Sequence, residues 1–159
     1  MTSPSGVVVR VTQDFSASPE RVFDAWFDPD QIGQWMFGPR LRDEEIVHLK
    51  TDPRVGGTFS FLVKRQGMAI DHVGTYREIE RPRRIVFTWG IAGSSADESV
   101  VEIGIAANAS GCTLTLTHHM DAKWAEYADR THAGWTTMLK ALDRVFSEKP
   151  GADPAGKRS

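Results

Sequence analysis

The 159-residue sequence has little of several features that would assign a chain to a functional class at once. It holds one cysteine, Cys112, so an intramolecular disulfide is excluded. It has no apolar run of about 18 residues, and its first residues lack the apolar stretch of a signal peptide. The formal net charge of −2 offers no basic surface for nucleic acid or an anionic membrane. We therefore expect a cytoplasmic protein whose partners are neither nucleic acids nor membranes.

The spacings that metal and nucleophile chemistry need are also missing. His118 and His119 are neighbours on an expected strand, so their side chains point to opposite faces and cannot share an ion. The sequence places no histidine beside Cys112, which favours a strand-start residue over a nucleophile. The carboxylates of Glu44 and Glu45 lie at a strand end, where solvation explains them. We expect no metal, no cofactor and no identifiable catalytic residue.

The part of the chain that does carry clear signals begins with a strand and two short helices. Residues 7–15 are rich in β-branched side chains, which favours a strand. Ser18-Pro19 then supplies a helix N-cap and a first helical residue. Asp28-Pro29 repeats this arrangement, with Gln31 at the position from which a capping-box side chain reaches back.

From residue 43 onward, apolar and polar residues alternate with the two-residue period of a strand. Six segments fit this period, with turn signals between most of them: 44–50, 58–64, 68–79, 84–89, 99–107 and 112–120. A helical period returns over about 123–147, and the polar tail 148–159 is expected to be disordered. Short connections favour antiparallel pairing. The pattern predicts one α+β domain over 1–147, in which a curved antiparallel sheet of six or seven strands carries a long C-terminal helix on its concave face.

The expected C-terminal helix has one bulky half and one half of small residues. Met138 and Leu142 belong to an apolar stripe, whereas the N-terminal part of the same face offers Ala128, Thr131 and, beside it, Gly134. A glycine inside a helix costs about 1 kcal/mol relative to alanine, so Gly134 should have a reason. Either the small residues let the helix approach the sheet closely, or they border a cavity.

Several expected strands have an inward apolar face that is interrupted by hydrogen-bonding groups. His72, Tyr76, Trp89 and His118 all share the inward phase of their strands. An apolar pocket with a few placed polar groups is typical of a small-molecule site, although each group could also be a satisfied core residue. On the pocket hypothesis the ligand-binding residues come from the strands, the second short helix and the last helix: Trp35, Phe59, Phe61, His72, Tyr76, Trp89, Leu116, His118, Gly134, Trp135 and Met138.

Five stretches, taken in order, resemble one known family. They are SPERVFDAWFDPDQIGQW (18–35), Gly56-Gly57 before TFSF, GTYREIERPRRIVFTW (74–89), TLTLTHH (113–119) and GWTTMLKALDRV (134–145). They resemble the homologues of the Hsp90 ATPase activator's C-terminal domain, within the START, Bet v 1 and polyketide-cyclase superfamily. The resemblance implies the helix-grip fold, with an apolar cavity between a curved sheet and the C-terminal helix. It implies no catalytic residues, because the family has no fixed catalytic motif.

Three functions stay open at this stage, so whether the protein is an enzyme is undecided. The first is binding of a small hydrophobic or aromatic molecule in the cavity between the sheet and the C-terminal helix. The second is a cyclase-like or aromatase-like enzyme using the same cavity, with His72 or His118 moving a proton. The third is a partner of an Hsp90-type chaperone, ranked lowest because a single domain lacks the additional N-terminal domain of such activators. A homodimer through a sheet edge or the short helices also stays open.

Overall fold

The computed structural model describes residues 6–148, with backbone alone at 94–97 and 148. The elements follow one another in this order: β1 (Val7–Phe15), α1 (Pro19–Asp24), α2 (Pro29–Trp35), β2 (Glu45–Thr51), β3 (Thr58–Arg65), β4 (Met68–Glu80), β5 (Arg84–Ile91), β6 (Ser94–Asn108), β7 (Gly111–Met120), the 3₁₀ helix η1 (Ala122–Tyr127) and α3 (Ala128–Glu148). Within residues 6–148, no helix is both long and apolar enough to span a lipid bilayer.

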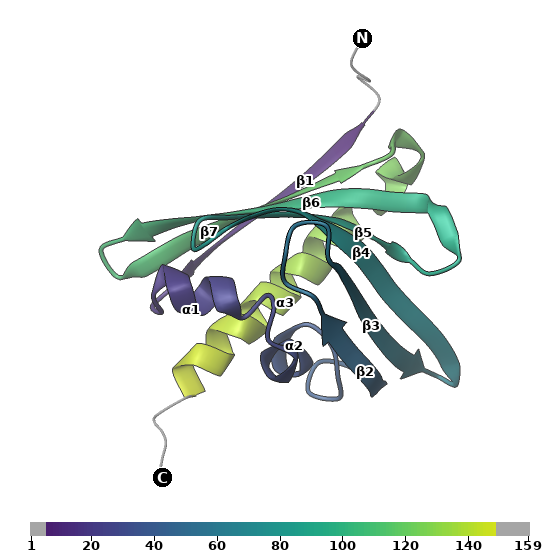
Figure 1. The fold of residues 1–159 in the computed structure, drawn as a ribbon, viewed down its shortest axis with the longest axis horizontal. Coiled ribbons are helices and arrows are strands. Elements are labelled where there is room, and N and C mark those ends of the chain that lie inside the picture. Colours follow the sequence, from purple (N-terminus) through teal and green to yellow (C-terminus); the bar gives the residue numbers. More distant parts are fainter. Residues whose placement is uncertain (1–5, 149–159) are drawn as a thin grey trace.

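Seven strands form one antiparallel sheet in the order β1-β7-β6-β5-β4-β3-β2. The first strand lies beside the last, with Val11 opposite Leu116. Figure 1 shows α1, α2 and α3 on one side of the sheet, with α3 running obliquely across it. The predicted α+β helix-grip fold is confirmed, with the larger of the two expected strand numbers.

Both short helices begin where the sequence predicted. The Ser18 side chain caps α1 by accepting a hydrogen bond from Arg21 N, and Asp28 caps α2 by accepting from Asp30 N. The capping box differs in one detail. Gln31 Nε2 donates to the Asp28 carboxylate at 3.4 Å, and the Asp28 backbone amide donates instead to the Asp24 carbonyl at 3.1 Å, so it needs no partner from Gln31.

Most boundaries differ from the prediction by one or two residues, and two differ by more. The C-terminal helix is α-helical only from Ala128, because Asp121 caps a separate 3₁₀ turn over Ala122–Tyr127. Strand β6 starts at Ser94 rather than Ser99, since Ile91 pairs with Ser94 across a two-residue turn. Gly93 adopts φ +86° in that turn, a conformation that favours glycine.

The sheet bends at Gly74, in the middle of β4. A Cβ at this position would overlap the carbonyl oxygen of Thr88 and the ring of Phe59. Thr75 N donates to the Thr88 hydroxyl at 2.8 Å, so a side chain takes part in the strand pairing. The register of β4 against β5 shifts just after Tyr76, and such a bulge bends a strand. The aromatic side chains of β3–β5 therefore converge on the concave side.

Candidate functional site

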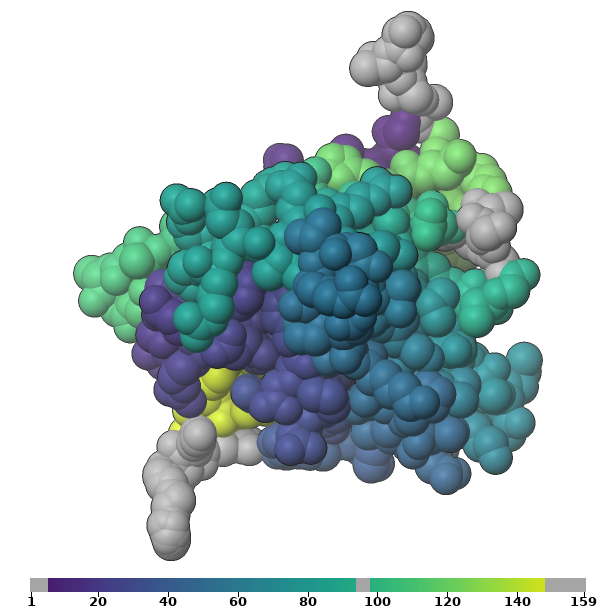
Figure 2. Space-filling model, viewed as in Figure 1, coloured from purple at the N-terminus to yellow at the C-terminus, as the bar shows by residue number. Residues whose placement is uncertain are grey.

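A small cavity lies under the concave face of the sheet, between β3–β5 and residues 18–37, here called the α1–α2 segment. The space open to the centre of a water-sized sphere is about 10 Å³, which is room for about one water molecule. Eight side chains line it, none of them charged: Trp26, Met36, Phe59, Phe61, Tyr76, Ile85, Phe87 and Trp89. In Figure 2 the α1–α2 segment, in purple to blue, packs beside the blue of β2.

This cavity differs in place from the one expected between the sheet and the C-terminal helix, since α3 supplies none of its eight wall residues. Trp135 of α3 occupies the neighbouring space. Its ring centroid lies 6.0 Å from that of Trp26 and 5.5 Å from that of Trp89, so Trp135 packs against two of the wall residues.

Two polar atoms on wall residues have no hydrogen-bond partner among the described residues. They are Trp26 Nε1 and Tyr76 Oη, whose residues are only 4% and 3% exposed. The neighbouring Trp35 shows the usual arrangement, because its Nε1 donates to the Ala25 carbonyl at 3.1 Å. A buried polar group left unpaired costs about 1–3 kcal/mol. The two atoms therefore mark a place where a polar group from outside the chain would be stabilising.

Tyr76 is held in its neutral form. Burial raises the pKa of its hydroxyl, and the nearby Asp52 carboxylate raises this pKa further. The group is therefore an uncharged hydrogen-bond donor and acceptor at neutral pH.

His118 belongs to a chain of hydrogen bonds that runs from the Trp135 side chain to the Trp89 carbonyl. Trp135 Nε1 donates to His118 Nδ1 at 3.0 Å, which places the ring proton on Nε2. Nε2 then donates to Ser99 Oγ at 2.7 Å, and Ser99 Oγ donates to the Trp89 carbonyl at 3.1 Å. Burial lowers the pKa of His118 to about 4, with a smaller effect of His119. Both ring nitrogens are in use, so the ring has no free position for proton transfer and cannot act as a base toward Ser99.

His72 is buried at the edge of the same aromatic cluster. Its Nδ1 donates to the Phe61 carbonyl at 3.2 Å, and its ring packs against Phe37 at 4.6 Å and Trp89 at 5.6 Å. Burial lowers the pKa of His72. The residue is not one of the eight that line the cavity.

The structure divides the predicted ligand-binding residues into three groups. Four line the cavity: Phe59, Phe61, Tyr76 and Trp89. Six pack in the surrounding core: Trp35, His72, Leu116, His118, Trp135 and Met138. Gly134 stands apart in α3.

Gly134 does not pack against the sheet. A Cβ added to it would meet no atom within 4 Å outside its own turn of helix. Close approach of helix and sheet therefore does not explain this glycine. The residue is half-buried, so its open side is either ligand space or solvent.

Four wall residues were absent from the predicted set: Trp26, Met36, Ile85 and Phe87. Ile85 and Phe87 share the inward alternation of Trp89. Trp26 follows Val22 at the four-residue spacing of a helix, although α1 itself ends at Asp24, so the sequence pattern contained a signal for these three residues. Met36 follows the last residue of α2, where no periodicity extends, and no sequence signal pointed to it.

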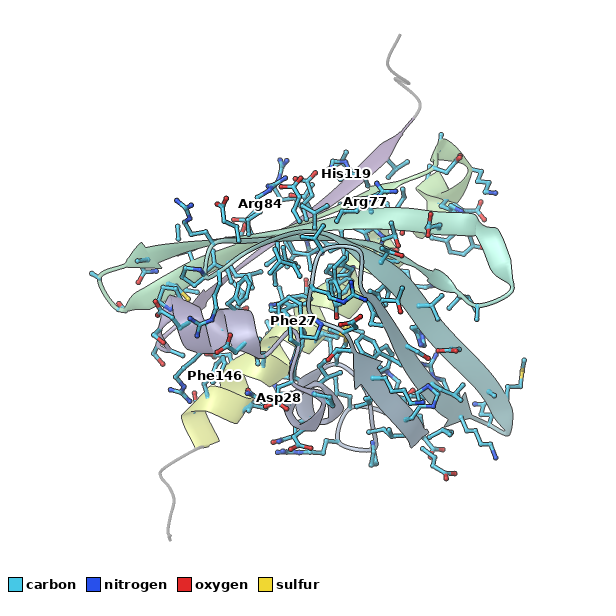
Figure 3. The ribbon with its side chains drawn as sticks, in the orientation of Figure 1. Phe27, Asp28, Arg77, Arg84, His119 and Phe146 are labelled. Carbon is cyan, nitrogen blue, oxygen red and sulfur yellow. The ribbon has the colours of Figure 1, made fainter. Side chains whose placement is uncertain are left out.

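An open groove lies on the outer side of the α1–α2 segment. It measures about 360 Å³ and is lined by Phe23, Asp24, Phe27, Asp28, Pro53, Ile79 and Arg81. The half-buried Phe27 packs on Tyr76 with ring centroids 5.1 Å apart, so one side chain contacts both the groove and a cavity-wall residue. Figure 3 shows Phe27 and Asp28 beneath the sheet, and Phe146 near the C-terminal end of α3.

The profile of the family described as "Activator of Hsp90 ATPase homolog 1-like protein" matches residues 16–147. The chain belongs to this family. The match extends from just before α1 to the end of α3 and so includes every wall residue of the cavity. The comparison with curated proteins found no match.

Solved structures similar to this family member share its fold. Protein CV1439 from Chromobacterium violaceum has a TM-score of 0.74 and 24% identity, over 87% of this chain and 95% of that chain. SA2116 from Staphylococcus aureus, described as a protein of unknown function, has a TM-score of 0.77 and 19% identity, over 89% and 94%. DynU16, described as a protein in the dynemicin biosynthetic locus, has a TM-score of 0.72 and 21% identity, over 89% of this chain and 47% of that chain.

In this family member, one carboxylate expected in solvent is buried. The Glu44 side chain has no exposed area and pairs with Arg65 at 2.8 Å and Arg42 at 3.1 Å. It also accepts a hydrogen bond from Gly38 N at 2.7 Å, whereas Glu45 is exposed. Two arginines and a backbone amide compensate the charge, and one of these arginines comes from β3, far along the chain. The assignment of Glu44 to solvent was therefore wrong.

The cavity wall of this family member carries few groups suited to acid–base or nucleophilic chemistry. The wall carries one ionisable side chain, Tyr76, and it is held neutral. Cys112 is buried away from the wall, and burial raises its pKa, which disfavours the reactive thiolate. Among residues 6–148, no three histidine, cysteine, aspartate or glutamate side chains come together in a way that could hold a metal ion.

Proposed function

We propose that this protein binds a small hydrophobic or aromatic molecule under the concave face of its sheet, in a widened form of the cavity between β3–β5 and the α1–α2 segment. The observation that carries the proposal is the wall. Eight side chains, none charged and six of them aromatic, surround a space that the core leaves unfilled. Protein cores are normally packed with few voids, and an apolar pocket with few polar groups is suited to small molecules.

A ligand larger than one water molecule requires the cavity to widen, and the α1–α2 segment is the part suited to move. Backbone amides from Val22 to Phe37 bond to carbonyls within the segment. Thr51 Oγ1 donates to the Phe27 carbonyl at 2.9 Å, and Arg81 pairs with Asp24 at 2.9 Å. Both side chains of that ion pair are about half exposed, and such surface pairs contribute little to stability. The segment can therefore shift without breaking strand pairing.

Phe27 gives the ligand a route. The ring separates the open groove of about 360 Å³ from Tyr76 on the cavity wall. A rotation of Phe27 away from Tyr76 would join the two spaces. The ligand then enters between the α1–α2 segment and the end of β4.

Binding of an apolar fluorescent probe tests the proposal. We expect the purified protein to bind the probe at one site, with native mass spectrometry giving the same stoichiometry. Phe27→Ala should increase the association rate by about tenfold, because the barrier ring is gone. Phe146→Ala is the matched control, since Phe146 is another half-buried phenylalanine that packs on Phe15, away from the cavity. Absence of probe binding by both the native protein and Phe27→Ala, each shown to be folded, would sink the proposal.

The other functions have less support from the site. A cyclase-like reaction needs a base on the wall, whereas His118 uses both ring nitrogens and His72 lies off the wall. Partnership with an Hsp90-type chaperone rests on the description of the family alone. A homodimer would use the unpaired edges of β1 and β2, and nothing at the cavity favours one.

A further inference from the structure

We infer that the ligand is an uncharged aromatic compound carrying a hydroxyl or carbonyl oxygen, which takes its hydrogen bonds from Trp26 Nε1 and Tyr76 Oη. This inference rests on the proposed binding function and narrows its ligand class. It follows from two polar atoms on an otherwise apolar wall for which the described residues supply no hydrogen-bond partner.

Trp26 sets the first requirement, which is a hydrogen-bond acceptor. An indole N–H can only donate. The ring is held by its neighbours, with centroids at 4.7 Å from Trp35, 6.1 Å from Phe87 and 6.0 Å from Trp135. While the α1–α2 segment is closed, the ring is therefore not free to turn toward an acceptor elsewhere in the protein. An oxygen of the ligand is the group that satisfies it.

Tyr76 sets the second requirement, which is a partner for a hydroxyl. Its ring lies among other aromatic rings, 5.1 Å from Phe27 and 5.5 Å from Phe59. A hydroxyl both donates and accepts, so a phenol and a ketone of the ligand are equally suitable. A pure hydrocarbon would leave both protein atoms unpaired.

The absence of charge on the wall sets the third requirement. None of the eight wall residues is cationic or anionic, so an ionised ligand would have no counter-ion there. Asp52 lies near enough to oppose ionisation of Tyr76, and it would oppose an anionic ligand in the same way. A carboxylate-bearing ligand is therefore disfavoured.

A single buried water is the competing occupant. The cavity has room for about one, and a water could pair with either atom. If water fulfils this role when a ligand is bound, an oxygen on the ligand brings no advantage. Ligands that differ in that oxygen separate the two cases.

The test is displacement of the apolar fluorescent probe by naphthalene, 1-naphthol and 1-naphthoate, which share one ring system. We expect 1-naphthol to bind about tenfold more tightly than naphthalene, the effect of one good hydrogen bond, and naphthoate to bind more weakly than naphthalene. In Tyr76→Phe the advantage of naphthol should shrink by at least threefold. Tyr127→Phe is the matched control, because Tyr127 lies in η1 and packs on Trp124, outside the cavity wall.

Each outcome decides something. Equal displacement by naphthalene and naphthol overturns the inference and leaves the proposed binding function standing. If naphthoate binds most tightly of the three, the inference is overturned, because the wall then accepts an anionic ligand. If the protein binds neither the probe nor any of the three ligands, both the inference and the proposed function are rejected. If Tyr76→Phe fails to fold, the order of the three ligands on the native protein still decides.

Discussion

At the scale of single residues, Tyr76 combines near-complete burial with a hydroxyl that finds no hydrogen-bond partner in the described part of the chain. Tyr76→Phe removes that hydroxyl and keeps the ring packing. We expect the free energy of unfolding to stay the same or to rise by up to about 1 kcal/mol, because an apolar group of the same shape no longer carries the cost of an unpaired polar atom. Denaturant unfolding of native protein, Tyr76→Phe and Tyr127→Phe measures this. If the free energy of unfolding falls by more than about 1 kcal/mol in Tyr76→Phe but not in Tyr127→Phe, the Tyr76 hydroxyl has a hydrogen-bond partner within the protein and does not need one from a ligand.

His118 carries a second residue-scale prediction, which concerns pH. Its pKa is lowered in the folded protein from 6.5 to about 4, so the folded state binds the proton more weakly than the unfolded state. Stability is therefore full above pH 6.5 and is lost as pH falls toward 4. This interval corresponds to about 3 kcal/mol. Other groups, carboxylates included, add their own pH dependence, so the contribution of His118 must be isolated by substitution.

The isolating comparison is His118→Gln against His132→Gln, with denaturant unfolding measured between pH 7 and pH 4. His118→Gln should be less stable at pH 7, because its chain of hydrogen bonds is broken, but should lose less stability on acidification. His132→Gln, at an exposed position on α3, should follow the native curve. Parallel curves for all three proteins would show that His118 titrates normally in the fold.

At the scale of the elements, helix starts were predictable from the sequence and exact ends were not. Ser18 and Asp28 cap their helices because a capping side chain acts within one turn, so the information is local. The 3₁₀ turn before α3 was missed, since apolar residues spaced three and four apart fit both helix types over a single turn. Gly74 alternates with His72 and Tyr76 along its strand, but the overlap that requires a glycine involves Thr88 and Phe59 on two other strands.

Helix α3 carries a prediction at Gly134. A Cβ there meets open space, and no positive φ restricts the position. Gly134→Ala should therefore raise the free energy of unfolding by about 1 kcal/mol through helix propensity alone. A loss of stability would mean that α3 moves closer to a neighbour than the structure shows.

Gly134→Leu then separates the two remaining explanations for the open side of Gly134. If the glycine borders ligand space, the leucine should fill it and abolish probe binding while the protein stays folded. If it faces solvent, binding should be unchanged. Titration with the apolar probe measures binding, and a thermal melt on the same sample shows whether the protein is folded.

At the scale of the whole molecule, the sequence predicted the fold well and the candidate site only in part. Alternating strands and one long final helix specify a helix-grip sheet, and the family match agrees. The position of the cavity depends on how residues distant in sequence meet. Met36, for example, reaches the wall from beyond the end of α2. Whether Trp26 Nε1 and Tyr76 Oη find partners is likewise a property of the assembled core, and no local pattern records it.

The last prediction concerns how stability is distributed over the molecule. If the α1–α2 segment opens to admit a ligand, its amides should exchange hydrogen faster than those of β5–β7, where each strand pairs on both sides. A saturating ligand such as 1-naphthol favours the ligand-bound state and should slow exchange in residues 18–37. It should leave β1, the edge strand farther along the sheet from β3–β5, nearly unchanged. Hydrogen exchange read by mass spectrometry, with and without ligand, measures this. Uniform slowing across the sheet and the segment alike would mean that the ligand stabilises the whole fold without closing the α1–α2 segment, and the proposed route past Phe27 would then be wrong.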